Sequence, residues 1–339
     1  QSSSAASDVY KRQGPLRARR PVSPSAPRHD ERPPVVLLLG PTASGKTELA
    51  VGLHDQLPVD VVSVDSALVY RGLDIGTAKP TPEVLAACPH RLVDVCEPES
   101  PYSAGRFRED AAREIEAIHA AGRVPLLVGG TMLYHRVIQT GIAPLPPRDP
   151  ALREQIDAEA ATRGWPAMHA DLATADPAAA ARIEPRDGQR IQRALEVLRL
   201  TGRTLSSWHA EVPPAPPWRF LKIGLWPADR AELHGRIEQR LAAMMSAGFL
   251  EEVRELRARP GLEGDLPSMR AVGYRQAWEW LEGKTTFEEM REMAIVATRQ
   301  LAKRQLTWLR QESTPVWYDL QTDSIKREVF ELLGGFLEA

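Results

Sequence analysis

A glycine-rich segment with the sequence GPTASGKT, Gly40–Thr47, dictates the architecture around it. The apolar run Val35 to Leu39 precedes this segment, and an amphipathic stretch follows it to about Leu57. A strand, a glycine-rich turn and a helix in this order form a phosphate-binding loop, or P-loop. The glycines let successive backbone N–H groups converge on one anion, and the helix N-terminus adds a positive dipole. The segment therefore predicts an α/β fold that binds a polyphosphate.

Strands and helices alternate after the loop. Apolar runs predict further buried strands at 59–64 and 124–128, and apolar residues at helical spacing predict a helix at 104–121. Parallel strands joined by helices give a sheet that is covered on both faces. The predicted fold class is α/β, namely a P-loop NTPase-like parallel sheet flanked by helices, with a helical insertion domain.

Two proline-rich segments, at 144–150 and 213–217, divide the chain. The sequence between them is rich in Ala, Arg and Glu, which predicts a helical insertion carried on two loops. Residues 1–34 are rich in Ser, Pro, Ala and Arg and lack apolar periodicity, so we interpret them as a disordered or non-native tail. The predicted domains are a P-loop core at 35–143 and 218–339 and an insertion at 144–217.

The α/β pattern resumes after the second proline-rich segment. A strand is predicted at 219–226, and a helix at 228–247 ends at Gly248. Further helices follow, including a long one at about 286–310, and 316–320 is a candidate edge strand.

Composition excludes several classes of protein. The formal net charge is −2, so any nucleic-acid site must be a local basic patch. The two cysteines, Cys88 and Cys96, match no zinc spacing and form no disulfide framework, which fits a reducing cytoplasm. No apolar run approaches the roughly 20 residues of a membrane span. We therefore expect a cytoplasmic protein with no membrane partner.

The loop itself supplies the first candidate site. Lys46 offers a point charge to a phosphate, and the Thr47 hydroxyl can bind Mg²⁺. Most P-loop enzymes place an acidic residue at the end of another strand, but the strand at 124–128 ends in Gly129-Gly130-Thr131. An NTPase motor or switch is therefore disfavoured. The predicted phosphate-binding residues are Gly40, Pro41, Thr42, Ala43, Ser44, Gly45, Lys46 and Thr47.

Asp65 is the nearest acidic residue at the end of a predicted strand. Ligands bind at the carboxyl edge of parallel sheets, where this carboxylate could accept a proton from an attacking nucleophile. The alternative is that Asp65 caps the following turn or binds Mg²⁺ indirectly. Local chemistry leaves both roles open.

Six sequence blocks, in order, together resemble the signature of the bacterial tRNA dimethylallyltransferase family, also called tRNA isopentenyltransferase. Their sequences are GPTASGKT at 40–47, SVDSAL at 63–68, DIGTAKP at 74–80, VGGTMLY at 128–134, RAVGYR at 270–275 and KRQLTWLR at 303–310. The resemblance extends from about Val35 to at least Arg310. It implies that the P-loop binds dimethylallyl diphosphate rather than a nucleotide, with help from Mg²⁺.

The family also implies the reaction. A dimethylallyl group passes from its diphosphate to the N6 amino group of adenosine 37, the nucleotide 3′ of the anticodon in tRNA, and diphosphate leaves. The target base is flipped into the enzyme, because a stacked base cannot present its edge to an enclosed site. The helical insertion binds the anticodon stem-loop. We expect a monomeric enzyme whose partners are tRNA and dimethylallyl diphosphate.

Site roles carry over by motif position. The resemblance implies that Asp65 is the base, with Thr131 and Arg153 also catalytic, and that Arg240 reaches the diphosphate. It implies tRNA contacts by Asp65, Ser66, Ala67, Leu68, Gln189, Arg190, Ile191, Gln192, Arg193, Arg270, Ala271, Val272, Gly273, Tyr274 and Arg275.

Two basic patches fit an RNA substrate. Residues 181–203 carry a net charge of +3, with Arg186, Arg190 and Arg193 at helical spacing on one face. Residues 298–310 carry a net charge of +4. Such faces bind RNA phosphates, but ordinary solvated helix faces look the same in sequence. The second patch adds predicted tRNA contacts at Lys303, Arg304 and Arg310.

Two other readings share some of these features. A P-loop small-molecule kinase would use the same fold and loop with ATP, but leaves the block around Asp65 and the basic insertion unexplained. A non-catalytic RNA-binding regulator would bind tRNA without releasing diphosphate, and an intact phosphate loop argues against it.

Overall fold

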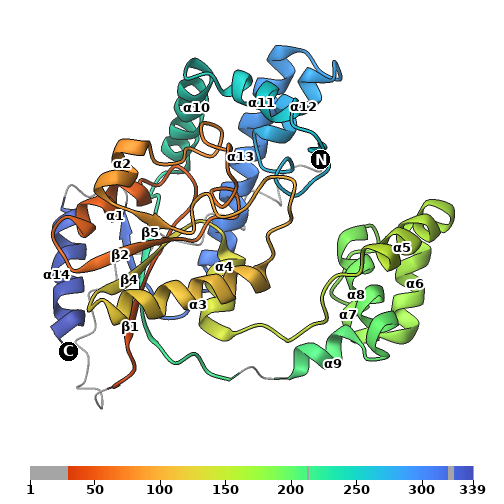
Figure 1. Cartoon of the computed structure of the whole chain (residues 1–339), viewed down its shortest axis with the longest axis horizontal. Helices are drawn as coiled ribbons and strands as arrows, with labels where there is room; N and C mark the ends of the chain where they lie inside the picture. Colours follow the sequence, from red (N-terminus) through yellow and green to blue (C-terminus); the bar gives the residue numbers. More distant parts are fainter. Residues whose placement is uncertain (1–29, 212–213, 320–323, 339) are drawn as a thin grey trace, which may run out of the picture. The chain divides into compact units, whose positions relative to one another are not determined.

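The computed structural model describes residues 30–211, 214–319 and 324–338 (Figure 1). The chain separates into two compact units. The first, here called the α/β unit, comprises Gln1–Ile138 and Pro217–Ala339, and the second, the helical unit, comprises Gln139–Pro216. The predicted domain junctions, after residues 143 and 217, lie near these divisions. Of the predicted tail, residues 1–29 lie outside the described residues.

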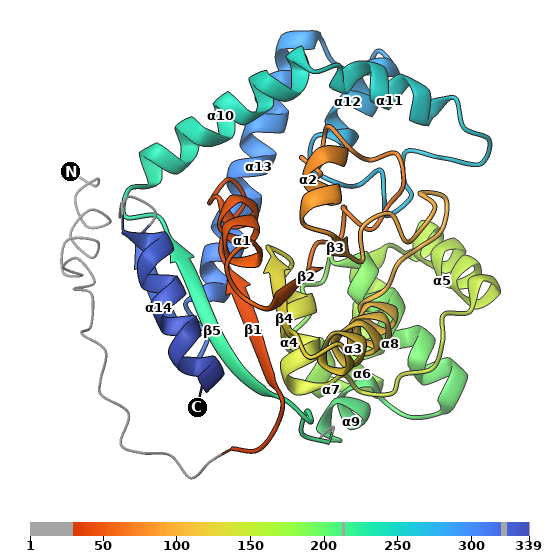
Figure 2. The ribbon, with the colours of Figure 1, turned by 60° about the vertical axis from the view of Figure 1, so that its left-hand side comes forward.

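The described part of the α/β unit contains a six-stranded sheet in the order β3-β2-β4-β1-β5-β6. All the strand pairs are parallel, as the alternating pattern predicts (Figure 2). The strands are β1 (Pro34–Leu39), β2 (Val59–Ser63), β3 (His90–Arg91), β4 (Val124–Gly129), β5 (Arg219–Trp226) and β6 (Val316–Asp319). Residue 320, predicted to end the last strand, lies outside the described residues.

Helices cover both faces of the sheet. Val36 and Leu38 of β1 point to one face, where they pack with α1 (Lys46–His54) and α14 (Ile325–Glu338) in one apolar cluster. On the other face α3 (Ala104–Ala120) packs against β2 and β4. Central strands buried on both faces need continuous apolar runs rather than alternation, which is why the sequence shows them as such.

The remaining helices of the α/β unit support the loops at the carboxyl edge of the sheet. The long α13 begins after Thr286, whose side chain and that of Glu289 form a capping box. The elements α2, β3, α4 and α14 were not predicted from the sequence. Of these, α2 and β3 are short, and α4 directly continues the turn after β4. The bounds are α2 (Pro82–Ala87), α4 (Met132–Thr140), α10 (Arg230–Ser246), α11 (Phe249–Arg257), α12 (Tyr274–Leu281) and α13 (Phe287–Leu309).

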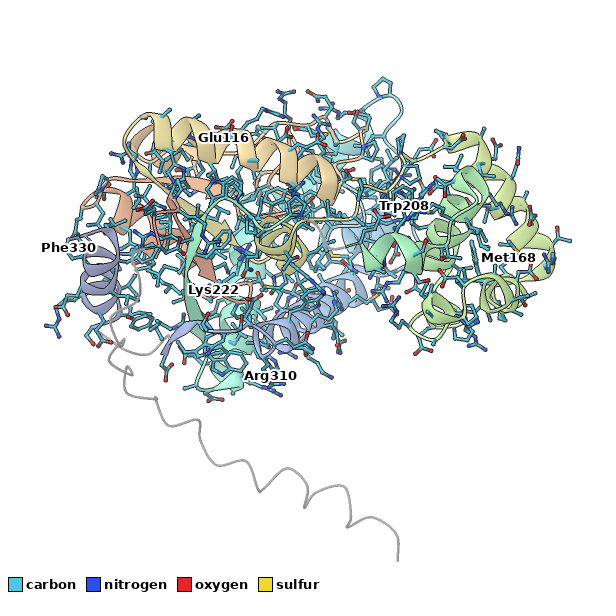
Figure 3. The ribbon with its side chains drawn as sticks, turned by 90° about the horizontal axis from the view of Figure 1, so that it is seen from below. Glu116, Met168, Trp208, Lys222, Arg310 and Phe330 are labelled. Atoms are coloured by element: carbon cyan, nitrogen blue, oxygen red, sulfur yellow. The ribbon has the colours of Figure 1, made fainter. Side chains whose placement is uncertain are left out.

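The helical unit has its own apolar core, built around Ile156, Met168 and Leu195 (Met168 is labelled in Figure 3). Aspartates accept N-terminal N–H groups at three helix starts, which fixes where the helices begin. The helices are α5 (Pro150–Arg163), α6 (Trp165–Ala175), α7 (Pro177–Ala180), α8 (Gly188–Thr201) and α9 (Leu205–Ala210). Among the described helices of either unit, none combines the length and apolarity needed to cross a bilayer.

Candidate active site

The P-loop connects β1 to α1 as the sequence predicts. Gly45 has a φ of 76°, in the left-handed region, and starts α1 without a side-chain cap. The Lys46 ammonium lies against the loop, donating to the Gly40 carbonyl at 2.9 Å, the Pro41 carbonyl at 2.6 Å and the Ser44 hydroxyl at 3.2 Å. All three acceptors are electrically neutral, so the positive charge of Lys46 remains available to an anion.

The environment of Lys46 disfavours its charge. Burial lowers the pKa of the ammonium to about 7, an effect opposed by the Asp65 carboxylate and increased by the Arg240 guanidinium. A bound diphosphate would supply negative charge and raise this pKa again. Lys46 is therefore a cation that gains most from an anionic partner.

Thr47 lies in the first turn of α1 and is exposed. No described residue takes its hydroxyl as a hydrogen-bond partner, so this oxygen can serve a cation beside a phosphate. Among the described residues, no group of three or more His, Cys, Asp or Glu side chains could hold a metal ion. A magnesium ion here would therefore depend on the diphosphate oxygens, water and Thr47, which suits its preference for oxygen ligands.

Asp65 and Thr131 lie together at the ends of β2 and β4. The Thr131 hydroxyl accepts from the Ser66 backbone N–H at 3.0 Å and lies 3.3 Å from the Ser66 hydroxyl. The Thr131 backbone N–H donates to the Val64 carbonyl at 3.2 Å. A side chain at Gly129 would lie only 2.0 Å from that carbonyl oxygen, so glycine is required for this close approach.

One oxygen of Asp65 has a structural task. Its Oδ1 accepts from the backbone N–H groups of Ala67 at 2.8 Å and Leu68 at 3.4 Å. The turn-capping role considered from the sequence is therefore real. It occupies a single carboxylate oxygen, so a second role for Oδ2 remains open.

Arg240 joins the P-loop to the DIGTAKP segment. Its guanidinium donates from Nη1 to the Thr42 hydroxyl at 3.3 Å and from Nη2 to the Thr77 carbonyl at 2.9 Å. Burial lowers the pKa of Arg240, and the Asp65 carboxylate opposes the shift. The predicted diphosphate-binding arginine thus lies beside the P-loop, although it follows the loop by almost 200 residues.

Glu252 is a supporting residue that sequence reasoning missed. Its carboxylate accepts from the backbone N–H groups of Asp74, Ile75 and Gly76 at 3.0, 2.6 and 3.1 Å. It also accepts from the Tyr274 hydroxyl at 2.5 Å. Glu252 therefore ties the DIGTAKP segment to α12. An acid in an amphipathic helix carries no sequence signal that distinguishes this role from a solvated position.

The RAVGYR segment lines a groove of about 750 Å³ within the α/β unit. Arg270 and Arg275 are exposed at the groove together with Arg304, while Val272, Met293 and Val296 give it apolar surface. Ala271 is half-buried. The segment cannot act as a uniform RNA contact, because Gly273 is buried and Tyr274 is fully buried with its hydroxyl on Glu252. The Tyr274 side chain thus has a packing role, and its predicted contact with tRNA stays a prediction.

The end of α13 presents the remaining predicted cations of this unit. Lys303, Arg304 and Arg310 are exposed. Arg310 is labelled in Figure 3. Its guanidinium lies 5.5 Å from the centre of the Trp226 ring, an arrangement that stabilises the cation without neutralising it.

In the helical unit, Arg153 and Arg193 bind the same buried carboxylate. Arg153 donates from Nε and Nη2 to the two oxygens of Glu196 at 2.9 and 3.0 Å. Arg193 donates to Glu196 at 2.6 Å and to the Pro146 carbonyl at 2.7 Å. Burial alone would raise the pKa of Glu196, but the hydrogen bonds from both arginines hold it at about 2. Both predicted substrate-binding arginines thus have a structural partner.

The first turns of α8 divide the QRIQR segment between two environments. Gln189 and Arg190 are exposed, whereas Ile191 is fully buried and Gln192 donates to the Asp157 carboxylate at 2.7 Å. The side chain of Ile191 packs in the apolar core of the helical unit, and the predicted tRNA contact of this residue stays a prediction. The expected arginine face is wrong in one member, because α8 begins after Asp187 and Arg186 precedes it. Arg186 therefore does not share a helix face with Arg190 and Arg193, despite the i, i+4, i+7 spacing.

Comparison with known proteins agrees with this geometry. A family model described as IPP transferase matches residues 68–312. A tRNA dimethylallyltransferase of Thioalkalivibrio sulfidiphilus is 59% identical over 279 residues, covering 82% of this chain and 87% of that protein. One of Thiobacillus denitrificans is 53% identical over 307 residues, covering 91% and 98%.

The fold agrees as well. The crystal structure of full-length tRNA isopentenylpyrophosphate transferase from Bacillus halodurans matches with a TM-score of 0.67 and 36% identity, covering 91% of this chain and 97% of that one. The chain has the parallel P-loop sheet and the motifs in the family's order, and its sequence identity extends over most of the relatives' length. It therefore belongs to the tRNA dimethylallyltransferase family of enzymes, whose family model is described as IPP transferase.

Proposed function

We propose that this enzyme transfers a dimethylallyl group from dimethylallyl diphosphate to the N6 amino group of adenosine 37 in tRNA. The observation that carries the proposal is the meeting of two sets of groups at one sheet edge. The P-loop with Lys46 suits a diphosphate, and Asp65 with Thr131 suits a nucleophile whose proton must leave. The names of the relatives, all tRNA dimethylallyltransferases, support the same reaction.

The chemistry explains why both sets are needed. An exocyclic adenine amine is a weak nucleophile, because its lone pair is delocalised into the ring. The new bond joins N6 to C1 of the dimethylallyl group, and the bond from C1 to the diphosphate oxygen breaks with its electron pair. The amine proton passes to Asp65 Oδ2. Catalysis then depends on stabilising the leaving diphosphate and aligning the amine with C1.

Lys46, the amides of the P-loop and Arg240 stabilise the leaving group in this proposal. Thr47 would help to hold a magnesium ion, which neutralises further charge on the departing diphosphate. The allylic centre must also be protected from water during the reaction. Thr131 would orient the acceptor through the same turn that fixes Asp65.

The tRNA would reach the enzyme through exposed cations in both units. Arg270, Arg275 and Arg304 line the groove, together with apolar side chains and the carboxylates of Glu289 and Glu292. Cations beside apolar surface suit an RNA segment with an unstacked base. Arg190 at the start of α8 would bind a phosphate of the anticodon stem-loop. Flipping the target base costs a few kcal/mol, which these contacts must offset.

Mass spectrometry of tRNA nucleosides tests the proposal. Purified enzyme is incubated with unmodified tRNA, magnesium and dimethylallyl diphosphate, and the anticodon-loop nucleosides are then analysed. We expect N6-(dimethylallyl)adenosine at position 37 and one diphosphate released per modified base. If a parallel reaction with ATP and nucleosides gave phosphoryl transfer while the tRNA stayed unmodified, a kinase would replace the proposed activity.

A further inference from the structure

Gln305, in the last turns of α13, connects the two halves of the candidate active site. Its side chain is 7% exposed. Its Oε1 accepts from the Thr42 backbone N–H at 2.8 Å, and its Nε2 donates to the Gly130 carbonyl at 2.9 Å. The two ends of one amide thus bind the P-loop and the turn that carries Thr131.

The chemical requirements at this position are narrow. A glutamate could accept from Thr42 but could not donate to Gly130 while ionised. A methionine of similar length could not donate and accepts only weakly. The turn is shaped to receive the amide. A Cβ added at Gly130 would lie 2.3 Å from Gln305 Nε2, and Gly130 does not have a positive φ. Space for Gln305, rather than backbone conformation, therefore explains the glycine.

Hydrogen bonds continue from Gln305 to the predicted base. Gly130 precedes Thr131, and the Thr131 hydroxyl accepts from the backbone N–H of Ser66, the residue after Asp65. On the other side, Arg240 binds the hydroxyl of Thr42. A continuous path thus leads from the loop that would hold the donor to the turn that would hold the acceptor. The backbones of β1 and β4 are already paired up to Leu39 and Gly129, and the Gln305 amide adds a side-chain link just beyond that pairing, between Thr42 and Gly130.

We propose that Gln305 is a positioning residue that sets the distance between the diphosphate-binding loop and the Asp65–Thr131 turn. The inference rests on the proposed function. Gln305 does not touch the reacting atoms. It aligns C1 of the bound donor with the amine of the acceptor. Without this link each substrate can still bind, but C1 of the donor and the amine of the acceptor are misaligned. The rate of bond formation therefore falls more than the affinity for either substrate.

Substitution of Gln305 by methionine tests this role. Single-turnover prenylation is measured at saturating substrates, beside the affinities for tRNA and for an unreactive thiolodiphosphate analogue of the donor. We expect the rate to fall about 10- to 100-fold, as for a small misalignment of reactants, while both affinities change by less than about threefold. Gln305→Glu, which keeps the acceptor but loses the donor, should also be slow.

Gly130→Ala provides an independent disruption of the same link, because its Cβ displaces the amide while Gln305 is retained. We expect a similar loss of rate, and no further loss in the Gln305→Met/Gly130→Ala double variant, since one link can be broken only once. Gln311→Met, on an exposed glutamine just beyond α13, is the matched control and should be unchanged.

Several outcomes would overturn the role of Gln305. They are a Gln305→Met rate within about threefold of the parent, a slow rate explained by weak donor binding alone, or additive losses in the double variant. Thermal unfolding of each variant identifies losses caused by instability, and Gly130→Ala decides the matter if Gln305→Met does not fold. Turnover by the parent enzyme in the same assay tests the proposed function separately.

Discussion

The α/β unit and the helical unit both contain partly buried cations, but the hydrogen-bond partners of these cations differ. In the α/β unit, Lys46 donates to two carbonyl oxygens and a hydroxyl. In the helical unit, Arg153 and Arg193 donate to the carboxylate of Glu196. A cation bound to neutral acceptors keeps its charge for a ligand, whereas one bound to a buried carboxylate has a partner already. The comparison assigns binding chemistry to Lys46 and mainly a structural role to the arginine pair.

Loss of the base should give the largest effect. Asp65→Ala removes both the proposed proton acceptor and the cap on the turn, whereas Asp65→Asn keeps an oxygen for the Ala67 and Leu68 N–H groups. We expect both variants to lose about 10²- to 10⁴-fold in single-turnover rate, the usual contribution of a general base, with tRNA affinity retained. If Asp65→Asn stayed within a few-fold of the parent, the residue would be a turn cap only.

Substitution of Lys46 should have the next largest effect. The parent enzyme should also show a pH dependence of kcat/KM that comes from this residue. Lys46→Met removes the charge, and we expect kcat/KM for dimethylallyl diphosphate to fall on the order of 100-fold. The low pKa, about 7, means that the ammonium loses its proton as the pH rises above that value. In the parent enzyme, kcat/KM should therefore decline on the alkaline side.

Lys46→Arg is the control for this pH dependence, because a guanidinium stays protonated throughout the range. The alkaline decline should shift or disappear in this variant, whatever its absolute rate. An unchanged profile in Lys46→Arg would assign the titration to another group.

Substitution of Glu196 should lower the stability of the helical unit rather than the rate of the reaction. Glu196→Ala leaves Arg153 and Arg193 without their buried partner, and breaking such a pair costs about 3 kcal/mol or more. Hydrogen exchange in α5 and α8 should speed up, while the single-turnover rate at saturating tRNA stays near that of the parent. A large loss of that rate with normal exchange would instead place the arginine pair in catalysis.

The same carboxylate predicts an acid sensitivity. The folded-state pKa of Glu196, about 2, lies below its ordinary value of 4.5, so its contribution to stability is complete above that value. It is lost as the pH falls from 4.5 toward 2. Between pH 4.5 and 2, the stability of α5 and α8 should depend less on pH in Glu196→Gln than in the parent, because the variant has no carboxylate to protonate. The variant is already less stable than the parent at neutral pH.

Arg190 should give the smallest effect. Its side chain is 70% exposed and pairs only loosely with Asp187, at 3.4 Å. Arg190→Ala should weaken tRNA binding a few-fold and reduce the salt dependence of the affinity by roughly one counterion. Arg193→Ala should instead destabilise the helical unit. Equal and purely salt-dependent effects of the two variants would remove the distinction between the exposed Arg190 and the paired Arg193.

Much of the α/β unit was predictable, because both sheet faces are buried and their apolar runs are long. The P-loop and Asp65 were also found from sequence, since each follows directly from the end of a strand. Arg240 was predicted through the family resemblance alone. Glu252 and Gln305 were not predicted, because both lie far from these motifs in the chain and tertiary packing brings them to the loops. The partners of Arg193 and Tyr274, the carboxylates of Glu196 and Glu252, were not predicted, because sequence shows a charge or a motif but not its buried partner.

The central claim is that the P-loop holds the leaving diphosphate while Asp65 faces the attacking amine. A crystal structure of the enzyme with a thiolodiphosphate donor analogue and an anticodon stem-loop tests it most directly. We predict the diphosphate on the loop amides and Lys46, with N6 of the flipped adenosine between Asp65 and C1 of the donor. A diphosphate bound elsewhere, or an adenosine whose amino group lies away from Asp65, would contradict the account.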